Sequence, residues 1–135
     1  MKRSIPYLIA FTILSIAAAY IWFFIWNPSA PSIENENAIS IDAATLFNAF
    51  VTDEKKANAD YLDKVLDVRG EVTNISVNTD GLPVILLKTN DMMFGINCTM
   101  EEKNISVKTG DQVTLKGLCT GYLTDVVLVR CHIKN

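Results

Sequence analysis

The stretch "GLCTGYLTDVVLVRCHI", residues 117–133, decides the fold of this chain. Apolar and β-branched residues fill its two ends, and "TGYLTD", residues 120–125, lies between them with the small and polar residues of a turn. This pattern predicts a β-hairpin. The stretch also contains Cys119, Cys131 and His132, so a metal site or a redox pair has to be compared with a purely structural hairpin.

The spacing of the cysteines argues against a metal site. Between Cys98, Cys119 and Cys131 there are 20 and 11 residues, whereas a zinc site usually has four ligands, with pairs in Cys-x2–4-Cys spacing. Cys131 and His132 are neighbours, so in a strand they point to opposite faces. No Cys-x-x-Cys motif is present. We therefore predict no metal, no cofactor and a structural role for the cysteines.

The residues before this hairpin predict three further strands. The first is long, and Gly70 lies near its middle, where a strand that bends sharply favours a residue without a Cβ. A polar connection separates the third strand from the fourth. Five strands arranged in this way predict a small closed Greek-key barrel. The predicted strands are residues 64–78, 84–89, 93–100, 112–119 and 126–133, within a barrel that spans residues 64–134.

One amphipathic helix is predicted before the barrel, over residues 42–60. Asp42 is its candidate N-cap. Apolar residues follow at helical spacing: Leu46, Phe47, Phe50, Val51 and Ala57. The fold class is therefore all-β with an N-terminal amphipathic helix, in one domain that spans residues 41–135.

The N-terminal segment predicts a membrane anchor. Residues 5–26 contain no charge, and a helix of that length extends about 33 Å, enough for a hydrocarbon core of roughly 30 Å. Lys2 and Arg3 precede it, so residues 1–4 should remain cytoplasmic and the domain should be periplasmic. The predicted protein is thus a single-pass inner-membrane protein that contacts the lipid bilayer through residues 5–26.

A cleaved signal peptide is the alternative to this anchor. The apolar run is longer than the roughly 7–15 residues typical of signal peptides. Pro28 and Pro31 flank Ala30, the one plausible cleavage site, and prolines at these positions disfavour cleavage. Residues 27–40 are rich in Pro, Ser, Asn and Glu and are predicted to form an extended linker.

Charge makes nucleic acid an unfavourable partner. Lys2 and Arg3 are the only charged residues before the linker, so the remaining chain has 10 cationic and 15 acidic residues and a net charge of −5. Binding to a phosphate backbone requires Lys and Arg to displace counterions. Nucleic acid is therefore not the expected partner.

The barrel sequence resembles the tRNA_anti-like family of OB-fold proteins. The resemblance covers residues 41 onward, and its specific part is a Lys-x-Gly-Asp-x-Val motif followed by a Cys-x-Gly pair and an Asp-Val-x-Leu-x-x-Cys ending. It implies a five-stranded OB-fold barrel, and it carries no settled function. The residues that match and would have structural roles are Tyr61, Lys64, Gly70, Gly110, Asp111, Gly117, Gly121 and Asp125.

The OB fold also suggests which cysteines could pair. Its third and fifth strands run parallel and side by side, so Cys98 and Cys131 could approach within the roughly 4.4–6.8 Å Cα separation that a disulfide needs. In an oxidising compartment one disulfide and one remaining thiol are expected. Cys119–Cys131 is the second possible pair, and three buried thiols are the third alternative.

No pattern indicates catalysis. The chain lacks a nucleophile–base pair, a phosphate-binding glycine loop and a paired catalytic carboxylate motif. We therefore predict a non-enzymatic binding module for an unknown protein or small ligand. The loops at residues 78–83, 101–108 and 120–125 would contact it. The candidate contact residues in the last loop are Tyr122, Leu123 and Asp125.

The alternative function is binding of an oligonucleotide or another anionic polymer on the strand face. Such a site needs stacking aromatic rings and a basic groove. Phe94 and Tyr122 are the aromatic residues near this face, and Phe94 is interpreted as a core residue. Arg69 and Lys88 are the nearest cations, with several acidic residues close by.

Overall fold

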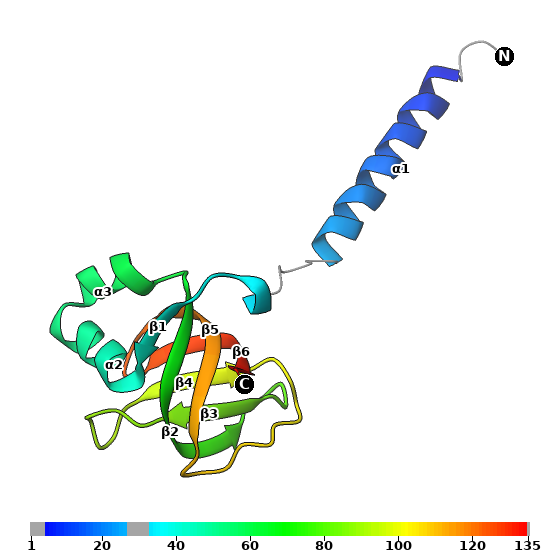
Figure 1. Ribbon diagram of the computed structural model, residues 1–135. Coiled ribbons are helices and arrows are strands. Elements are labelled where there is room, and N and C mark those ends of the chain that lie inside the picture. The colour runs from blue at the N-terminus through cyan, green and yellow to red at the C-terminus, as the bar shows by residue number, and fades with distance from the viewer. Residues whose placement is uncertain (1–4, 27–32, 135) are drawn as a thin grey trace. The chain divides into compact units, whose positions relative to one another are not determined.

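The structure is a computed structural model that describes residues 5–26 and 33–134, and it divides into two units, residues 1–31 and 32–135 (Figure 1). In the first unit, α1 (Ile5–Trp26) forms where the sequence predicted a helix. Among the residues described here, no helix meets the length and apolarity expected of a membrane span. The transmembrane span predicted over residues 5–26 stays a prediction. Residues 1–4 and 27–32, predicted as cytoplasmic terminus and linker, lie outside the described residues.

Five strands of the second unit form a closed barrel, which confirms the predicted fold (Figure 1). The strand order is β1-β2-β3-β4-β6-β5, and an additional pairing of β2 with β5 closes the ring. β4 and β6 run parallel, and the other barrel pairs are antiparallel. The strands of the barrel are β2 (Val65–Val77), β3 (Pro83–Leu87), β4 (Ile96–Met100), β5 (Gln112–Tyr122) and β6 (Val126–Lys134).

β2 belongs to both sides of the barrel, as the length of the predicted first strand suggested. Its first half pairs with β5 and its second half with β3, and the register shifts between Val72 and Asn74. Gly70 lies at the changeover. A Cβ at this position would lie 3.0 Å from the Cβ of Ala43 and 3.3 Å from that of Leu87. Glycine therefore allows a helix to pack closely on the strand.

A sixth strand, β1 (Ile39–Asp42), was not predicted. It follows a short 3-10 turn, η1 (Ile33–Asn35), and pairs in parallel with β2. Ile33 is only 3 % exposed, and Lys116 Nζ donates hydrogen bonds to the backbone oxygens of Glu34 and Glu36. The predicted linker over residues 27–40 therefore needs correction from residue 33 onward. The open edge of β2 supplies backbone partners that the local composition could not reveal.

The predicted helix over residues 42–60 is two helices, α2 (Ala43–Thr52) and α3 (Glu54–Tyr61). Asp53 separates them because its backbone is not helical, and its side chain accepts a hydrogen bond from Lys56 N at 3.0 Å. It is therefore a side-chain N-cap that begins a new helix. Asp42 occupies the N-cap position of α2 but makes no capping hydrogen bond with its side chain.

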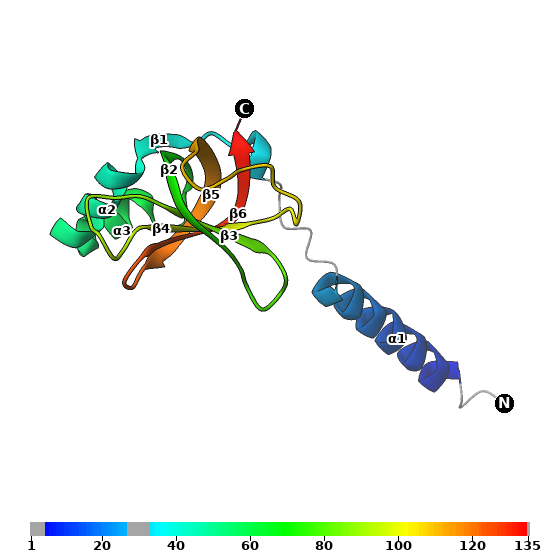
Figure 2. The ribbon, with the colours of Figure 1, turned by 90° about the horizontal axis from the view of Figure 1, so that it is seen from below.

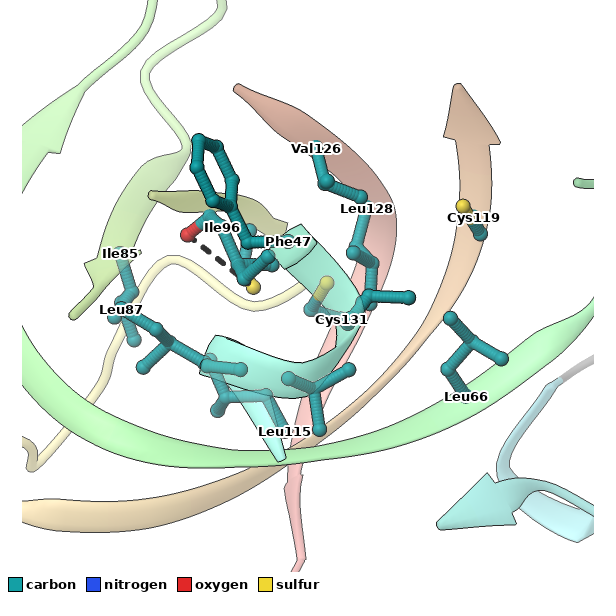
Figure 3. Packing of buried hydrophobic residues seen from close by; sticks show 14 of the residues in the cluster. Phe47, Leu66, Ile85, Leu87, Ile96, Leu115, Cys119, Val126, Leu128 and Cys131 are labelled. Atoms are coloured by element: carbon teal, nitrogen blue, oxygen red, sulfur yellow. Dashed lines mark hydrogen bonds between the residues drawn. The ribbon is translucent and has the colours of Figure 1, made fainter. Parts of the chain in front are cut away.

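The core lies between α2 and the inward face of the barrel (Figure 3). In β3 and β4 every second residue is buried, as expected for strands with one face turned inward. Burial of each large aliphatic or aromatic side chain stabilises the fold by roughly 1.5–3 kcal/mol. The largest buried side chains include Leu46, Phe50, Leu66, Ile85, Leu87, Ile96, Leu115 and Leu128.

Candidate functional site

The outward face of β3 and β4 is uncharged. Val84 lies opposite Thr99 and Leu86 lies opposite Asn97 in the register of these two strands. All four side chains are half-buried, and they alternate with the buried core positions. Because both strands are described in full and offer neither an outward aromatic ring nor an outward cation, they lack the groups that bind stacked bases and phosphates.

The turn between β5 and β6 is attached to its surroundings by two of the three predicted contact residues. The ring of Tyr122 stacks on Phe50, with 5.7 Å between centroids, and meets Phe47 edge-on at 6.1 Å. Asp125 Oδ1 accepts a hydrogen bond from Gly95 N at 2.8 Å. Tyr122 thus holds the hairpin on α2, and Asp125 ties it to the segment before β4. Leu123, the third predicted residue, is 87 % exposed.

The connection between β3 and β4, residues 88–95, is a turn held by its own side chains. Asp91 Oδ1 accepts hydrogen bonds from Met93 N at 2.7 Å and Phe94 N at 3.0 Å. Thr89 Oγ1 donates to the Phe94 backbone oxygen at 2.6 Å and accepts from Asp91 N at 3.2 Å. These four hydrogen bonds fix the backbone in a conformation that turns Met92 and Met93 towards solvent.

We call four exposed apolar side chains the apolar rim: Met92, Met93 and Phe94 of this connection, and Leu123 of the adjoining β5–β6 turn. Met92 is fully exposed, Met93 is 78 % exposed, and Phe94 is just over one third exposed. The bond between Asp125 and Gly95 joins the two loops that carry these residues. A cleft of about 390 Å³ lies beside the rim, lined by residues of this loop together with Thr73 and Leu86. Such a group of exposed apolar side chains is typical of an interaction surface.

Of the apolar rim, only Leu123 is a predicted contact residue. The sequence pattern places Met93 at the start of the third strand and Phe94 in the core, whereas β4 begins at Ile96. A usable signal was present. Asn90 and Asp91 are residues that hydrogen-bond to the backbone in turns, and three consecutive apolar residues cannot all face the inside of an alternating strand.

A second cleft, of about 470 Å³, is lined by residues of β1, β2, β5 and β6, and its charges are matched. It is lined by Asp42, Asp67, Arg69 and Lys134, among others. Lys134 Nζ donates a hydrogen bond to Oδ2 of the buried Asp67. Two acidic and two basic side chains leave no net charge that would attract an ion. This cleft is therefore a weaker candidate than the apolar rim.

The residues that carry the family resemblance occupy structural positions. Tyr61 packs near Phe50, and Lys64 Nζ donates a hydrogen bond to the Ala59 backbone oxygen. Gly110 has a φ of +95°, a backbone conformation that glycine adopts more easily than other residues. Its N–H donates a hydrogen bond to Val72 O at 2.7 Å. Asp111 Oδ2 accepts from Lys108 N at 2.8 Å.

Gly121, another of these residues, has a φ of +135° and lies in β5 at a register shift opposite β6.

Of the other two loops predicted to make contacts, the one at residues 78–83 is closed by Asn78, whose Oδ1 accepts hydrogen bonds from Asp80 N and Leu82 N. The loop at residues 101–108 is mostly polar and exposed.

The three cysteines are free thiols, and all are buried. A hydrogen bond with Cys98, together with burial, raises the pKa of Cys131 well above the ordinary value of 9.0. Burial also raises the pKa of Cys119. Among the described residues, no group of three His, Cys, Asp or Glu side chains could hold a metal ion. The predicted Cys98–Cys131 bond is not formed here, and the pairing stays a prediction.

The fold and the apolar rim define a class of protein, a small OB-fold domain whose candidate site is an apolar surface. The chain belongs to the tRNA_anti-like family, because the model of that family matches residues 1–133. The structure is similar to a crystal structure from Klebsiella pneumoniae described as a "putative nucleic acid-binding lipoprotein". The two have 17 % sequence identity and a TM-score of 0.59, over 81 % of this chain and 100 % of that one. At this identity the likeness shows the fold alone. A search of curated proteins found no match.

Proposed function

We propose that this protein is a non-catalytic binding module that holds a protein partner through the apolar rim. The observation that carries the proposal is the exposure of Met92 and Met93 on a turn whose backbone is fixed by four hydrogen bonds. Exposed large apolar side chains lower solubility. Where the backbone that carries them is also ordered, they indicate an interaction surface. An ordered loop loses little conformational entropy on binding.

The composition of the rim favours a protein partner. Methionine and aromatic side chains are enriched in protein interfaces, and methionine adapts its shape to different apolar surfaces. A nucleic acid partner would instead require cations. The one cation in the loop, Lys88, lies 3.5 Å from Glu71 Oε2, which partly neutralises it. The net charge of −5 over residues 27–135 acts in the same direction.

Attachment to the membrane is the second part of the proposal, and it rests on the sequence. Residues 5–26 carry no charge and follow Lys2 and Arg3, the arrangement expected of a signal anchor that leaves its C-terminal domain in the periplasm. The module would then present the apolar rim to partners in the cell envelope.

Site-specific photo-crosslinking tests the rim. A benzophenone amino acid at position 92 in the full-length protein, in intact membranes, should capture a protein partner. The double substitution Met92→Asp and Met93→Asp places two charges in the contact and should reduce co-purification of that partner at least tenfold. The rim substitutions should leave the fold intact, because both side chains are exposed.

Val77→Asp is the matched control. Val77 is 67 % exposed and pairs with Pro83 at the β2–β3 hairpin, which lies on the side of the barrel away from α2 and α3 (Figures 1 and 2). Capture should be unaffected by this substitution. Equal loss in both variants, or equal capture by the double rim variant and the native protein, would contradict the proposal.

Oligonucleotide binding is the alternative function, and the description of the Klebsiella pneumoniae structure favours it. The same pull-down distinguishes it. Co-purified nucleic acid that is released steeply as salt rises would indicate phosphate contacts, whereas an apolar contact with a protein depends little on salt.

A further inference from the structure

Cys98 and Cys131 meet inside the barrel. They come from the neighbouring parallel strands β4 and β6, in which Cys98 lies opposite Leu128 and Met100 lies opposite Cys131. The register shifts between these two pairs. Both side chains are completely buried, and the contact with Cys98 raises the pKa of Cys131. Figure 3 shows Cys131 among the buried apolar side chains. The Cys98 thiol donates a hydrogen bond to the Ile96 backbone oxygen at 4.0 Å.

The backbone of β6 departs from regular geometry so that Cys131 faces inward. Val126 and Leu128 are buried, so strict alternation would bury residue 130 and expose residue 131. Arg130 instead adopts a φ of +56°, a left-handed conformation that is uncommon for a residue with a side chain. This residue interrupts the alternation, and Cys131 becomes buried in place of Arg130.

The facing strand β5 is adapted to the same side chain. Gly117 lies at the point where the pairing of β5 with β6 shifts register, between Lys116 and Leu118. A Cβ at position 117 would be only 2.5 Å from the Sγ of Cys131. Glycine therefore leaves the space that this sulfur occupies. Features of three strands thus converge on one pair of thiols.

We propose that Cys98 and Cys131 form a disulfide that cross-links β4 to β6, and that Cys119 remains a thiol. Cys119 belongs to β5, and in Figure 3 it stands well apart from Cys131. The position of Cys119 therefore excludes it from the disulfide, and a difference in thiol reactivity is not required to explain the pairing.

The oxidation requires an electron acceptor, which we assign to a small-molecule disulfide such as oxidised glutathione. The thiolate of one cysteine attacks that disulfide and forms a mixed disulfide, releasing one glutathione thiolate. The second cysteine then displaces the other glutathione. Two protons and two electrons leave the protein, and the acceptor becomes two thiols. Because the folded site is buried, the exchange takes place before the barrel closes, in an oxidising compartment.

Thiol trapping after refolding tests the pairing. The full-length protein is purified in detergent, reduced, unfolded, and refolded with a mixture of reduced and oxidised glutathione. It is then unfolded again in excess N-ethylmaleimide and weighed by mass spectrometry. We expect one maleimide adduct in place of three, located on Cys119, and a peptide containing Cys98 linked to a peptide containing Cys131.

Two variants make the result specific. Cys119→Ala should still form the bond and carry no adduct. Cys98→Ala should carry two adducts and form no internal disulfide, because Cys119 and Cys131 do not meet. Circular dichroism confirms that each variant has folded. A native protein that refolds with three adducts, or a disulfide that includes Cys119, would overturn the assignment without reference to any variant.

Discussion

Gly117 is the residue at which the absence of a side chain matters most. It lies in β5 beneath Cys131, and a Cβ there would also lie 3.3 Å from the Cβ of Leu128. Protein interiors are packed to crystal-like density, so a single added methyl group must displace a neighbour. Cys131 is completely buried, and a Cβ only 2.5 Å from its Sγ would force one of the two groups to shift.

Replacing Gly117 with alanine should destabilise the barrel. Forcing an extra methyl group into a packed core typically costs about 1–3 kcal/mol, and the free energy of unfolding should fall by that amount in guanidinium titrations under reducing conditions. In a Cys131→Ala background the sulfur is absent, so the same substitution should cost clearly less. An equal cost in the two backgrounds would show that Cys131 is not the group that Gly117 accommodates.

At the scale of elements, α2 closes one end of the barrel. Its buried residues Leu46, Phe47 and Phe50 face the strands, and Tyr122 of the β5–β6 turn packs on the two phenylalanines. The helix therefore supports the hairpin that carries Leu123, part of the apolar rim. Loss of this packing would loosen the rim as well as the core.

Substitutions on the buried and exposed faces of α2 should differ in their effect on the free energy of unfolding. Phe50→Ala removes a completely buried ring and should lower the free energy of unfolding by about 3–5 kcal/mol. The adjacent Val51 is exposed, and Val51→Ala should change stability by no more than about 0.5 kcal/mol. Thermal unfolding monitored by circular dichroism measures both. Similar costs at the two positions would contradict the orientation of the helix described above.

At the scale of the whole molecule, the barrel brings distant loops together at one end. Both views place the β3–β4 connection on the same side of the barrel as α2 and α3, while the β2–β3 hairpin lies on the other side (Figures 1 and 2). The apolar rim therefore occupies one end of the domain. The proposed partner would approach from that end.

Membrane attachment is tested on the complete chain. If residues 5–26 form a signal anchor, the full-length protein should stay with the membranes after an alkaline carbonate wash, because burial of 22 uncharged residues outweighs surface electrostatics. A variant that lacks residues 1–26 should move to the soluble fraction. Release of the full-length protein by carbonate would contradict the anchor.

The type of the barrel strands and their succession along the chain could be predicted from local patterns. Period-two alternation and turn residues depend on near neighbours in the chain. The five barrel strands and the loop before β5 could therefore be predicted from the sequence. The same local signals gave the helical segment after Asp42 but not its break at Asp53, whose capping role depends on one hydrogen bond.

The site could not be predicted in this way, because it depends on contacts between residues far apart in the chain. β1 exists because β2 offers it a free edge, and the apolar rim is assembled by the bond from Asp125 to Gly95, 30 residues away. Tyr122 and Asp125 are residue types common in contact surfaces. In the folded domain, however, Tyr122 packs on α2 and Asp125 hydrogen-bonds to Gly95, so both hold the β5–β6 turn in place. Local periodicity therefore determines the elements of this protein, whereas only tertiary packing decides which side chains face solvent together.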